Sequence, residues 1–194
     1  LNINNLNTIK EIRNPVVICG SGPAGMALAL TLERKSIPSI IIESGYREYN
    51  EKAQSRYDGA VFGNFPDNMM YSRLSQFGGT SGHWGGTSRP LDSYDYEFWP
   101  INKSELDKYL DDSCSFLGIR NLFGEFDINE NLKLIEFQQS RLRISEKYFD
   151  YVKKSNKIHL LLESSIYDLE IDDGIVKSIL IKHLSNITKK IDTG

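Results

Sequence analysis

A glycine-rich turn between an apolar strand and a helix constrains this chain more than any other feature. The mostly β-branched run Pro15–Cys19 predicts a buried parallel strand. Gly20 follows it at once, and the helix predicted over Pro23–Lys35 carries a wide apolar side. A second apolar run, Ser39–Glu43, ends in a carboxylate. The sequence therefore predicts a βαβ unit with parallel strands.

Each glycine of the turn has its own task. Gly20 supplies a backbone conformation that residues with a Cβ avoid, Gly22 lets the main chain approach a pyrophosphate, and Gly25 lets the helix pack against the strand. Ser21 and Pro23 complete the turn. The helix N-terminus that follows presents free N–H groups and a positive dipole end, which favour a phosphate.

Glu43 stands where dinucleotide sites place the carboxylate that accepts hydrogen bonds from a ribose. It follows Gly25 by 18 residues, close to the spacing of about 20 that this role requires. A glycine motif by itself is weak evidence. Because a strand, a helix, a second strand and this acid all fall in the expected places, the sequence indicates dinucleotide binding.

Composition limits the remaining possibilities. A chain of 194 residues with 40% hydrophobic content can form one domain with a real core, and a net charge of −3 with scattered basic residues gives no reason to expect nucleic acid. No apolar run approaches the roughly 18 residues of a membrane span. Two cysteines cannot form a disulfide framework, so Cys19 and Cys114 are predicted as small core residues in a reducing, cytoplasmic protein.

A second glycine cluster follows a long irregular segment that extends from Ser44 to about Tyr71. The run from Gly78 to Gly86 holds five glycines in nine residues, together with His83 and Trp84. Such a loop can lay its backbone on a flat ring or a phosphate. The alternative is a flexible linker, for which an imidazole and an indole are unusual choices.

Taken with Glu43-Ser44-Gly45, the two clusters resemble the amino-terminal half of the glucose-methanol-choline (GMC) flavoprotein oxidoreductases. The tract Gly78–Trp84 is most similar to the sugar-oxidising, pyranose oxidase-like branch. Most members carry Asn near the position of Trp84, so this sequence departs from the majority pattern. The resemblance extends from Pro15 to the end of the chain.

The resemblance implies an α/β fold: an incomplete Rossmann-like FAD-binding domain over residues 15–194, preceded by a polar segment over residues 1–14. An antiparallel β-meander would be inserted in this domain, and part of a substrate-side insertion would lie near residues 120–140. The implied FAD site comprises Gly20, Ser21, Gly22, Pro23, Gly25, Glu43, Gly78, Gly79, Thr80, Ser81, His83, Trp84 and Ile166.

Three of these residues have specific roles by the same resemblance. Glu43 would hold the adenosine ribose, and the backbone of Ile166 would meet the adenine, although a role as a core isoleucine stays open. In several members the histidine that matches His83 is bonded covalently to the flavin. The alternative is a histidine that only forms a hydrogen bond near the flavin ring.

The resemblance also implies an activity, namely hydride transfer from the CH–OH group of an alcohol, a sugar or another polyol to the flavin. The chain would supply only the FAD-binding half and be inactive alone, so no catalytic acid or base is assigned. His159 and His183 have no partners at metal-ligand spacing, so no metal site is expected. The sequence leaves the electron acceptor open.

The sequence leaves two alternative functions open. An NAD(P)-dependent reductase would share the βαβ unit but has no use for the second glycine cluster. A non-catalytic binding protein with a flavoprotein fold would share both clusters.

Further secondary structure is predicted more coarsely. A helix beginning at Ser104 should continue to Gly118. A buried strand, a hairpin around Asp172-Asp173-Gly174 and a last strand are predicted over Ile158–Leu162, Ile166–Ile171, Ile175–His183 and from about Ile187.

Overall fold

The computed structural model describes residues 12–63, 68–185 and 187–192. Most of the polar segment predicted over residues 1–14 therefore lies outside the described residues. The chain forms two compact units: a first unit made of residues 1–83 and 143–194, and a second unit made of residues 84–142.

The first unit is built around a parallel sheet of three strands. Strands β1 (Val16–Cys19), β2 (Ser39–Ile42) and β7 (Ile158–Leu161) lie in the order β1-β2-β7. Helix α1 (Pro23–Arg34) connects β1 to β2. The predicted βαβ unit is confirmed to within one residue at each boundary, and the predicted buried strand at 158–162 is the third member of its sheet.

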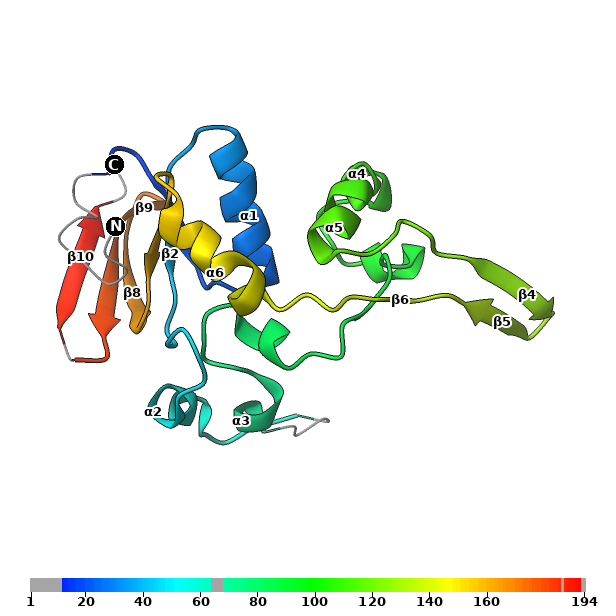
Figure 1. Ribbon diagram of the computed structural model, residues 1–194, viewed down its shortest axis with the longest axis horizontal. Helices are drawn as coiled ribbons and strands as arrows, with labels where there is room; N and C mark the ends of the chain where they lie inside the picture. The colour runs from blue at the N-terminus through cyan, green and yellow to red at the C-terminus, as the bar shows by residue number, and fades with distance from the viewer. Residues whose placement is uncertain (1–11, 64–67, 186, 193–194) are drawn as a thin grey trace. The chain divides into compact units, whose positions relative to one another are not determined.

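Helix α1 packs on one face of this sheet, and an antiparallel β-meander covers the other (Figure 1). The meander consists of β8 (Ser164–Asp172), β9 (Ile175–His183) and β10 (Thr188–Asp192), in the order β10-β9-β8. The predicted hairpin and last strand are thus confirmed.

The core between the two sheets consists of aliphatic residues that alternate along the strands, as a half-buried face requires. Its buried members are Ile40, Ile42, Leu161, Ile179 and Ile181. On the opposite face, the buried residues Met26 and Ala29 belong to α1. Strands β2 and β7 are therefore largely buried, which is the usual state of parallel strands. Strand β1 corrects the prediction of a buried strand over Pro15–Cys19, because only Ile18 is buried while Val16 and Cys19 are exposed.

The segment predicted to be irregular between Ser44 and Tyr71 contains short helices: α2 (Glu51–Gln54), η2 (Ser55–Tyr57) and α3 (Met69–Ser72). The side chain of Gln54, which is 1% exposed, orders this region. Its amide nitrogen donates to the carbonyl oxygens of Met70 and Arg73 at 2.7 and 2.8 Å, and its amide oxygen accepts from Ser75 N. The hydrogen bonds of one buried glutamine thus hold α2 to the backbone from Met70 to Ser75.

Helix α6 (Ile144–Lys154) also belongs to the first unit. The hydroxyl groups of Tyr151 and Ser155, near its end, both donate to the Glu33 carboxylate of α1. Phe149 packs edge-on against the fully buried Phe77, with ring centroids 5.5 Å apart. These contacts join α6 to α1 and to the segment that precedes the second glycine cluster.

The second unit contains short elements: β3 (Thr87–Ser88), η4 (Ser93–Tyr96), α4 (Lys103–Asp107), α5 (Leu110–Leu117), β4 (Glu125–Asn129), β5 (Leu132–Ile135) and β6 (Gln138–Gln139). The prediction of one helix from Ser104 to Gly118 is wrong at its start and in its middle. Asn102 forms the cap, because its side chain accepts from Glu105 N while the Glu105 carboxylate accepts from Asn102 N. The helix ends after Asp107, and α5 stops at Gly118 with φ +68°, as predicted.

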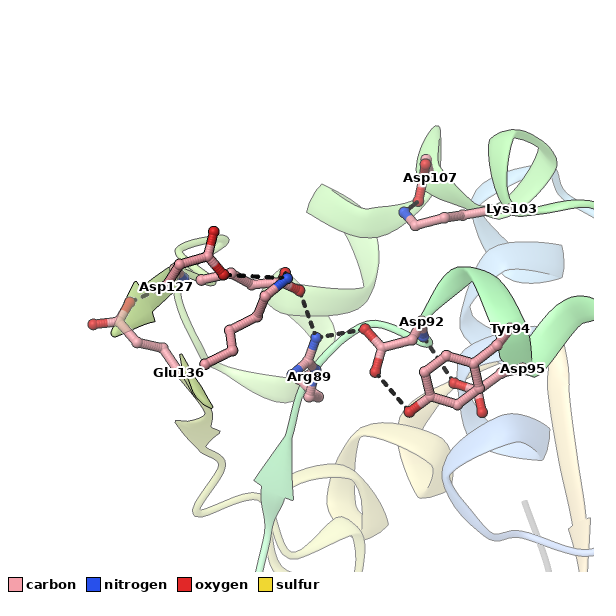
Figure 2. Close-up of polar contacts among 11 residues, drawn as sticks. Arg89, Asp92, Tyr94, Asp95, Lys103, Asp107, Asp127 and Glu136 are labelled. Atoms are coloured by element: carbon pink, nitrogen blue, oxygen red, sulfur yellow. Dashed lines mark hydrogen bonds and ion pairs between the residues drawn. The ribbon is translucent and has the colours of Figure 1, made fainter. Parts of the chain in front are cut away.

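Arg89 organises the polar contacts of the second unit. Its guanidinium forms ion pairs with Asp92 at 2.7 Å and with Glu125 of the β4–β5 hairpin at 3.0 Å. Figure 2 shows Arg89 between Asp92 and this hairpin. Hydrogen bonds from Lys133 and Arg89 hold the pKa of Glu125 below its usual value. The cluster thus fastens the base of the hairpin to the segment that contains Arg89.

Candidate functional site

A cavity of about 500 Å³ opens where β1 and β2 end and α1 begins. Its volume lies within the range of roughly 300–1,000 Å³ that is typical of small-molecule sites. The cavity belongs entirely to the first unit. Seven of the predicted site residues line it, namely Gly20, Gly22, Pro23, Glu43, Gly79, Thr80 and Ile166.

The glycine turn at the head of α1 has the geometry expected from its sequence. Gly20 has φ +94°, a conformation that residues with a Cβ rarely adopt, and its N–H donates to Ile42 O at 2.8 Å. A Cβ on Gly25 would lie 2.1 Å from Gly20 O, so this glycine is required for α1 to pack against β1. A Cβ on Gly22 would meet no protein atom within 4 Å.

The N-terminus of α1 faces the cavity through Gly22 and Pro23. No side chain caps this end of the helix, and its first turn carries no acidic residue. Within the part of the chain that the structure describes, no lysine or arginine lines the cavity. An anion bound here would therefore be held by main-chain N–H groups and by the helix dipole.

Glu43 lines the cavity and is only 5% exposed. Its Oε2 accepts from Ser21 Oγ at 2.6 Å and from Ser21 N at 3.1 Å. Its Oε1 accepts from Gly45 N at 2.7 Å and from Ser44 Oγ at 3.4 Å. These donors compensate for the burial of a charge and fix the orientation of the carboxylate.

The glycine of Glu43-Ser44-Gly45 has a steric explanation. A Cβ on Gly45 would lie 2.2 Å from the carbonyl carbon and oxygen of Ser75. Beyond this contact, Phe77 N donates to Tyr46 O at 2.7 Å. The backbone that follows β2 therefore touches the backbone that precedes the second glycine cluster, and only glycine allows this approach.

The second glycine cluster begins with Gly78 at φ +88° and continues as the short helix η3 (Gly79–Gly82). Gly79 and Thr80 line the cavity. The buried Ser81 supports them, because its hydroxyl donates to Gly78 O at 2.7 Å and accepts from Ile144 N. Gly78 N donates to Ser21 Oγ at 2.9 Å. Ser21, Gly78 and Ser81 thus act as supports of the cavity wall.

His83 and Trp84 lie on either side of the boundary between the two units. His83 caps the end of η3 in the first unit, and its side chain is exposed. Trp84 belongs to the second unit, where its indole N–H donates to Leu142 O at 2.9 Å. Neither residue lines the cavity.

Several lining residues were not predicted: Cys19, Ile42, Ser44, Tyr57, Leu74, Ser164 and Ser165. Cys19 corrects a prediction, because it is exposed rather than part of the core, whereas Cys114 is buried as expected. Burial, and then the nearby Glu43 carboxylate, raise the pKa of the Tyr57 phenol. The Tyr57 side chain is therefore a neutral phenol in the wall of the cavity.

In residues 12–63, 68–185 and 187–192, no group of three or more His, Cys, Asp and Glu side chains could hold a metal ion. Over the same residues, no helix is long and apolar enough to cross a membrane.

Comparisons with known proteins give a structural match without a sequence match. No model of a protein family matches this chain, and no curated protein matches it. The solved structure of pyridoxine 4-oxidase from Mesorbium loti is similar over 92% of this chain, with a TM-score of 0.56 and 13% identity. The match covers 47% of that protein. This chain thus shares the fold of about half of an oxidase.

Two further solved structures are similar over 92% of this chain. One is the myxobacterial chondrochloren halogenase, described as a variant of FAD-dependent halogenases, with a TM-score of 0.47, 9% identity and 35% of that protein covered. The other is a flavoprotein/dehydrogenase from Cytophaga hutchinsonii, with a TM-score of 0.44, 12% identity and 37% covered. We base the fold assignment on the oxidase.

Proposed function

We propose that this chain is the FAD-binding part of an oxidoreductase of the GMC type. The observation that carries the proposal is the meeting of two glycine clusters at one cavity. Gly22 of the first cluster and Gly79 of the second line the same space together with Glu43. A nicotinamide site needs only the first of these clusters, whereas an FAD molecule extends far enough to use both.

The cavity suits an FAD molecule in three respects. The uncapped N-terminus of α1 would bind the pyrophosphate. Glu43 would accept a hydrogen bond from the adenosine ribose, and the backbone of Ile166 would meet the adenine, since both residues line the cavity. The bound flavin would supply the chemistry of hydride acceptance.

The residues of this chain would bind, orient and shield the cofactor. Gly20 and Gly25 hold α1 against β1, so that the N–H groups at the start of the helix point at a fixed place. Tyr57 and Glu43 add a donor and an acceptor at the nucleotide side. We assign no catalytic base to these residues.

For the whole protein, we propose oxidation of a CH–OH group in a sugar or another polyol. The support is the likeness of Gly78–Trp84 to the sugar-oxidising branch of the family, together with a fold shared with an enzyme named as an oxidase. Positioned donors and a neutral imidazole from elsewhere in the full protein would complete the reaction. We propose no electron acceptor.

The first test is the cofactor itself. We expect the purified full protein to bind FAD and to show the visible absorbance of a flavin, which an alcohol or sugar substrate should bleach under anaerobic conditions. Isothermal titration of the flavin-free His83→Ala variant with FAD, NADH and NADPH measures the preference directly, because this variant cannot bond the flavin covalently. Binding of a nicotinamide dinucleotide without FAD would contradict the proposal and support a reductase. Binding of FAD without bleaching by any alcohol or sugar would support a non-catalytic protein.

A second test concerns His83. A covalent bond between its imidazole and a flavin methyl group remains a prediction, which the exposure of His83 permits. We expect acid precipitation of the holoprotein to leave the yellow colour in the pellet, and His83→Ala to release it into the supernatant. His159→Ala is the matched control, because His159 lies on β7 and does not line the cavity. Complete release of the colour from the unmodified protein would show that His83 forms no such bond.

A further inference from the structure

We propose that Ser21 is a positioning residue that couples the two glycine clusters and sets the Glu43 carboxylate for FAD. The inference rests on the proposed FAD site and adds a role for a side chain that does not line the cavity. The basis of the inference is the buried Ser21 hydroxyl, which forms hydrogen bonds with both Glu43 and Gly78.

The contacts of Ser21 use its hydroxyl in both directions. The residue is 0% exposed. Its Oγ donates to Glu43 Oε2 at 2.6 Å and accepts from Gly78 N at 2.9 Å. A hydroxyl has one proton and two lone pairs, so it can form both bonds at once. Alanine at this position could form neither, and cysteine would form both only weakly.

The bond from Gly78 spans 57 residues of sequence and directly joins the two clusters. The next residue, Gly79, lies so near the first cluster that a Cβ on it would be 3.4 Å from Gly22 Cα. Helix η3 has a second attachment, because the Ser81 hydroxyl accepts a hydrogen bond from Ile144 N at 3.3 Å. The Ser21 hydroxyl therefore helps to set the spacing between the N-terminus of α1 and the start of η3.

The hydrogen bonds to the Glu43 carboxylate differ in length. The longest of them marks the acceptor site that a ligand hydroxyl can take over. An ionised carboxylate offers about four acceptor sites, and four protein donors already surround this one. The two from Ser21 and the one from Gly45 N are 2.6 to 3.1 Å long. The contact from Ser44 Oγ is 3.4 Å long, so it is the weakest. A ribose hydroxyl would replace Ser44, while Ser21 would stay.

This assignment gives Ser21 and Ser44 opposite behaviour on substitution by alanine. In Ser21→Ala, Gly78 N loses its buried acceptor and Glu43 loses its shortest bond. We expect the dissociation constant for FAD to rise about 10-fold or more. In Ser44→Ala, we expect a change of less than about twofold. Both variants remove one serine hydroxyl that touches Glu43, so Ser44→Ala is a matched control.

Comparison of FAD with ADP separates coupling from general damage. ADP would fill only the adenosine and pyrophosphate part of the cavity, whereas FAD would extend further along the second cluster toward the flavin side. We therefore expect Ser21→Ala to weaken FAD binding several-fold more than ADP binding, as measured by isothermal titration of the flavin-free full protein that also carries His83→Ala and cannot bond the flavin covalently. Cysteine is close to serine in size. In Ser21→Cys, FAD affinity should again fall more than ADP affinity, and both losses should be smaller than in Ser21→Ala. This variant also provides the test if Ser21→Ala does not fold.

The outcomes are distinct. Equal losses for FAD and ADP in the Ser21 variants would overturn the coupling, and so would an equal loss of FAD affinity in Ser44→Ala. FAD affinity unchanged in both Ser21 variants, with normal FAD binding by the unmodified protein, would overturn the inference alone. Failure of the unmodified protein to bind FAD would overturn the proposed function and, with it, the inference.

Discussion

Replacement of Gly22 by alanine is expected to weaken FAD binding roughly 100-fold, which corresponds to about 2.7 kcal/mol, and to leave the fold intact. The backbone of Gly22 has φ −63°, which any residue adopts, and an added Cβ meets no protein atom within 4 Å. The methyl group would therefore cost the protein little. It would instead occupy space at the cavity wall, where the pyrophosphate must approach the main chain. Titration with FAD in the His83→Ala background and thermal denaturation measure the two effects separately.

Gly25→Ala is the contrasting variant. Its Cβ would lie 2.1 Å from Gly20 O and 3.2 Å from a methyl group of Ile18, so α1 would have to move away from β1. We expect destabilisation of about 3 kcal/mol or more, at the upper end of overpacking effects. Gly59→Ala serves as the neutral control, since its Cβ also meets nothing and Gly59 is not a lining residue. Unchanged FAD affinity in Gly22→Ala would contradict the placement of the pyrophosphate.

Replacement of Glu43 by alanine is expected to reduce both stability and FAD affinity strongly. The variant would leave buried donors of Ser21 and Gly45 without an acceptor, at about 1–3 kcal/mol for each unsatisfied group. The full protein should therefore unfold at a clearly lower temperature. Its FAD affinity should fall further, because the ribose acceptor is also lost.

Glu43→Gln makes the same test without a change of volume. An amide accepts on one side only, and its NH₂ group would face the donors of either Ser21 or Gly45. We expect this variant to retain its fold and to lose most of its FAD affinity in a titration. Glu48→Gln is the control, because the Glu48 side chain is 83% exposed. Equal FAD affinities in Glu43→Gln and in the control would show that the Glu43 carboxylate has no part in binding.

The βαβ unit was predictable because short-range sterics determine it. Gly20 must adopt a positive φ, and Gly25 must lie against a backbone oxygen, so both positions are marked in the sequence by the one residue that fits. The meander was predictable for a similar reason, since the turn at Asp173 and Gly174, both with positive φ, falls between two apolar runs.

Other parts depended on contacts between distant residues, which spacing does not reveal. Tyr57 and Ser165 reach the cavity from an irregular segment and from the start of the meander. The signal for Ser165 was present, because it directly precedes Ile166, which was a predicted site residue. Cys19 was predicted to be buried from its apolar neighbours, but it stands at the end of β1, where the chain opens to the cavity.

The order of the parallel strands also bears on how the chain folds. Strand β7 pairs with β2, although residues 43–157 separate the two strands in sequence. At a synthesis rate of about 5–20 residues per second, the ribosome needs roughly 6 to 23 s to make that stretch. During this interval the edge of β2, with Ile40, Ile41 and Ile42, awaits its partner. Such an edge can pair with other chains, so correct folding of this protein in the cell depends on how well newly made β2 is kept from other strands.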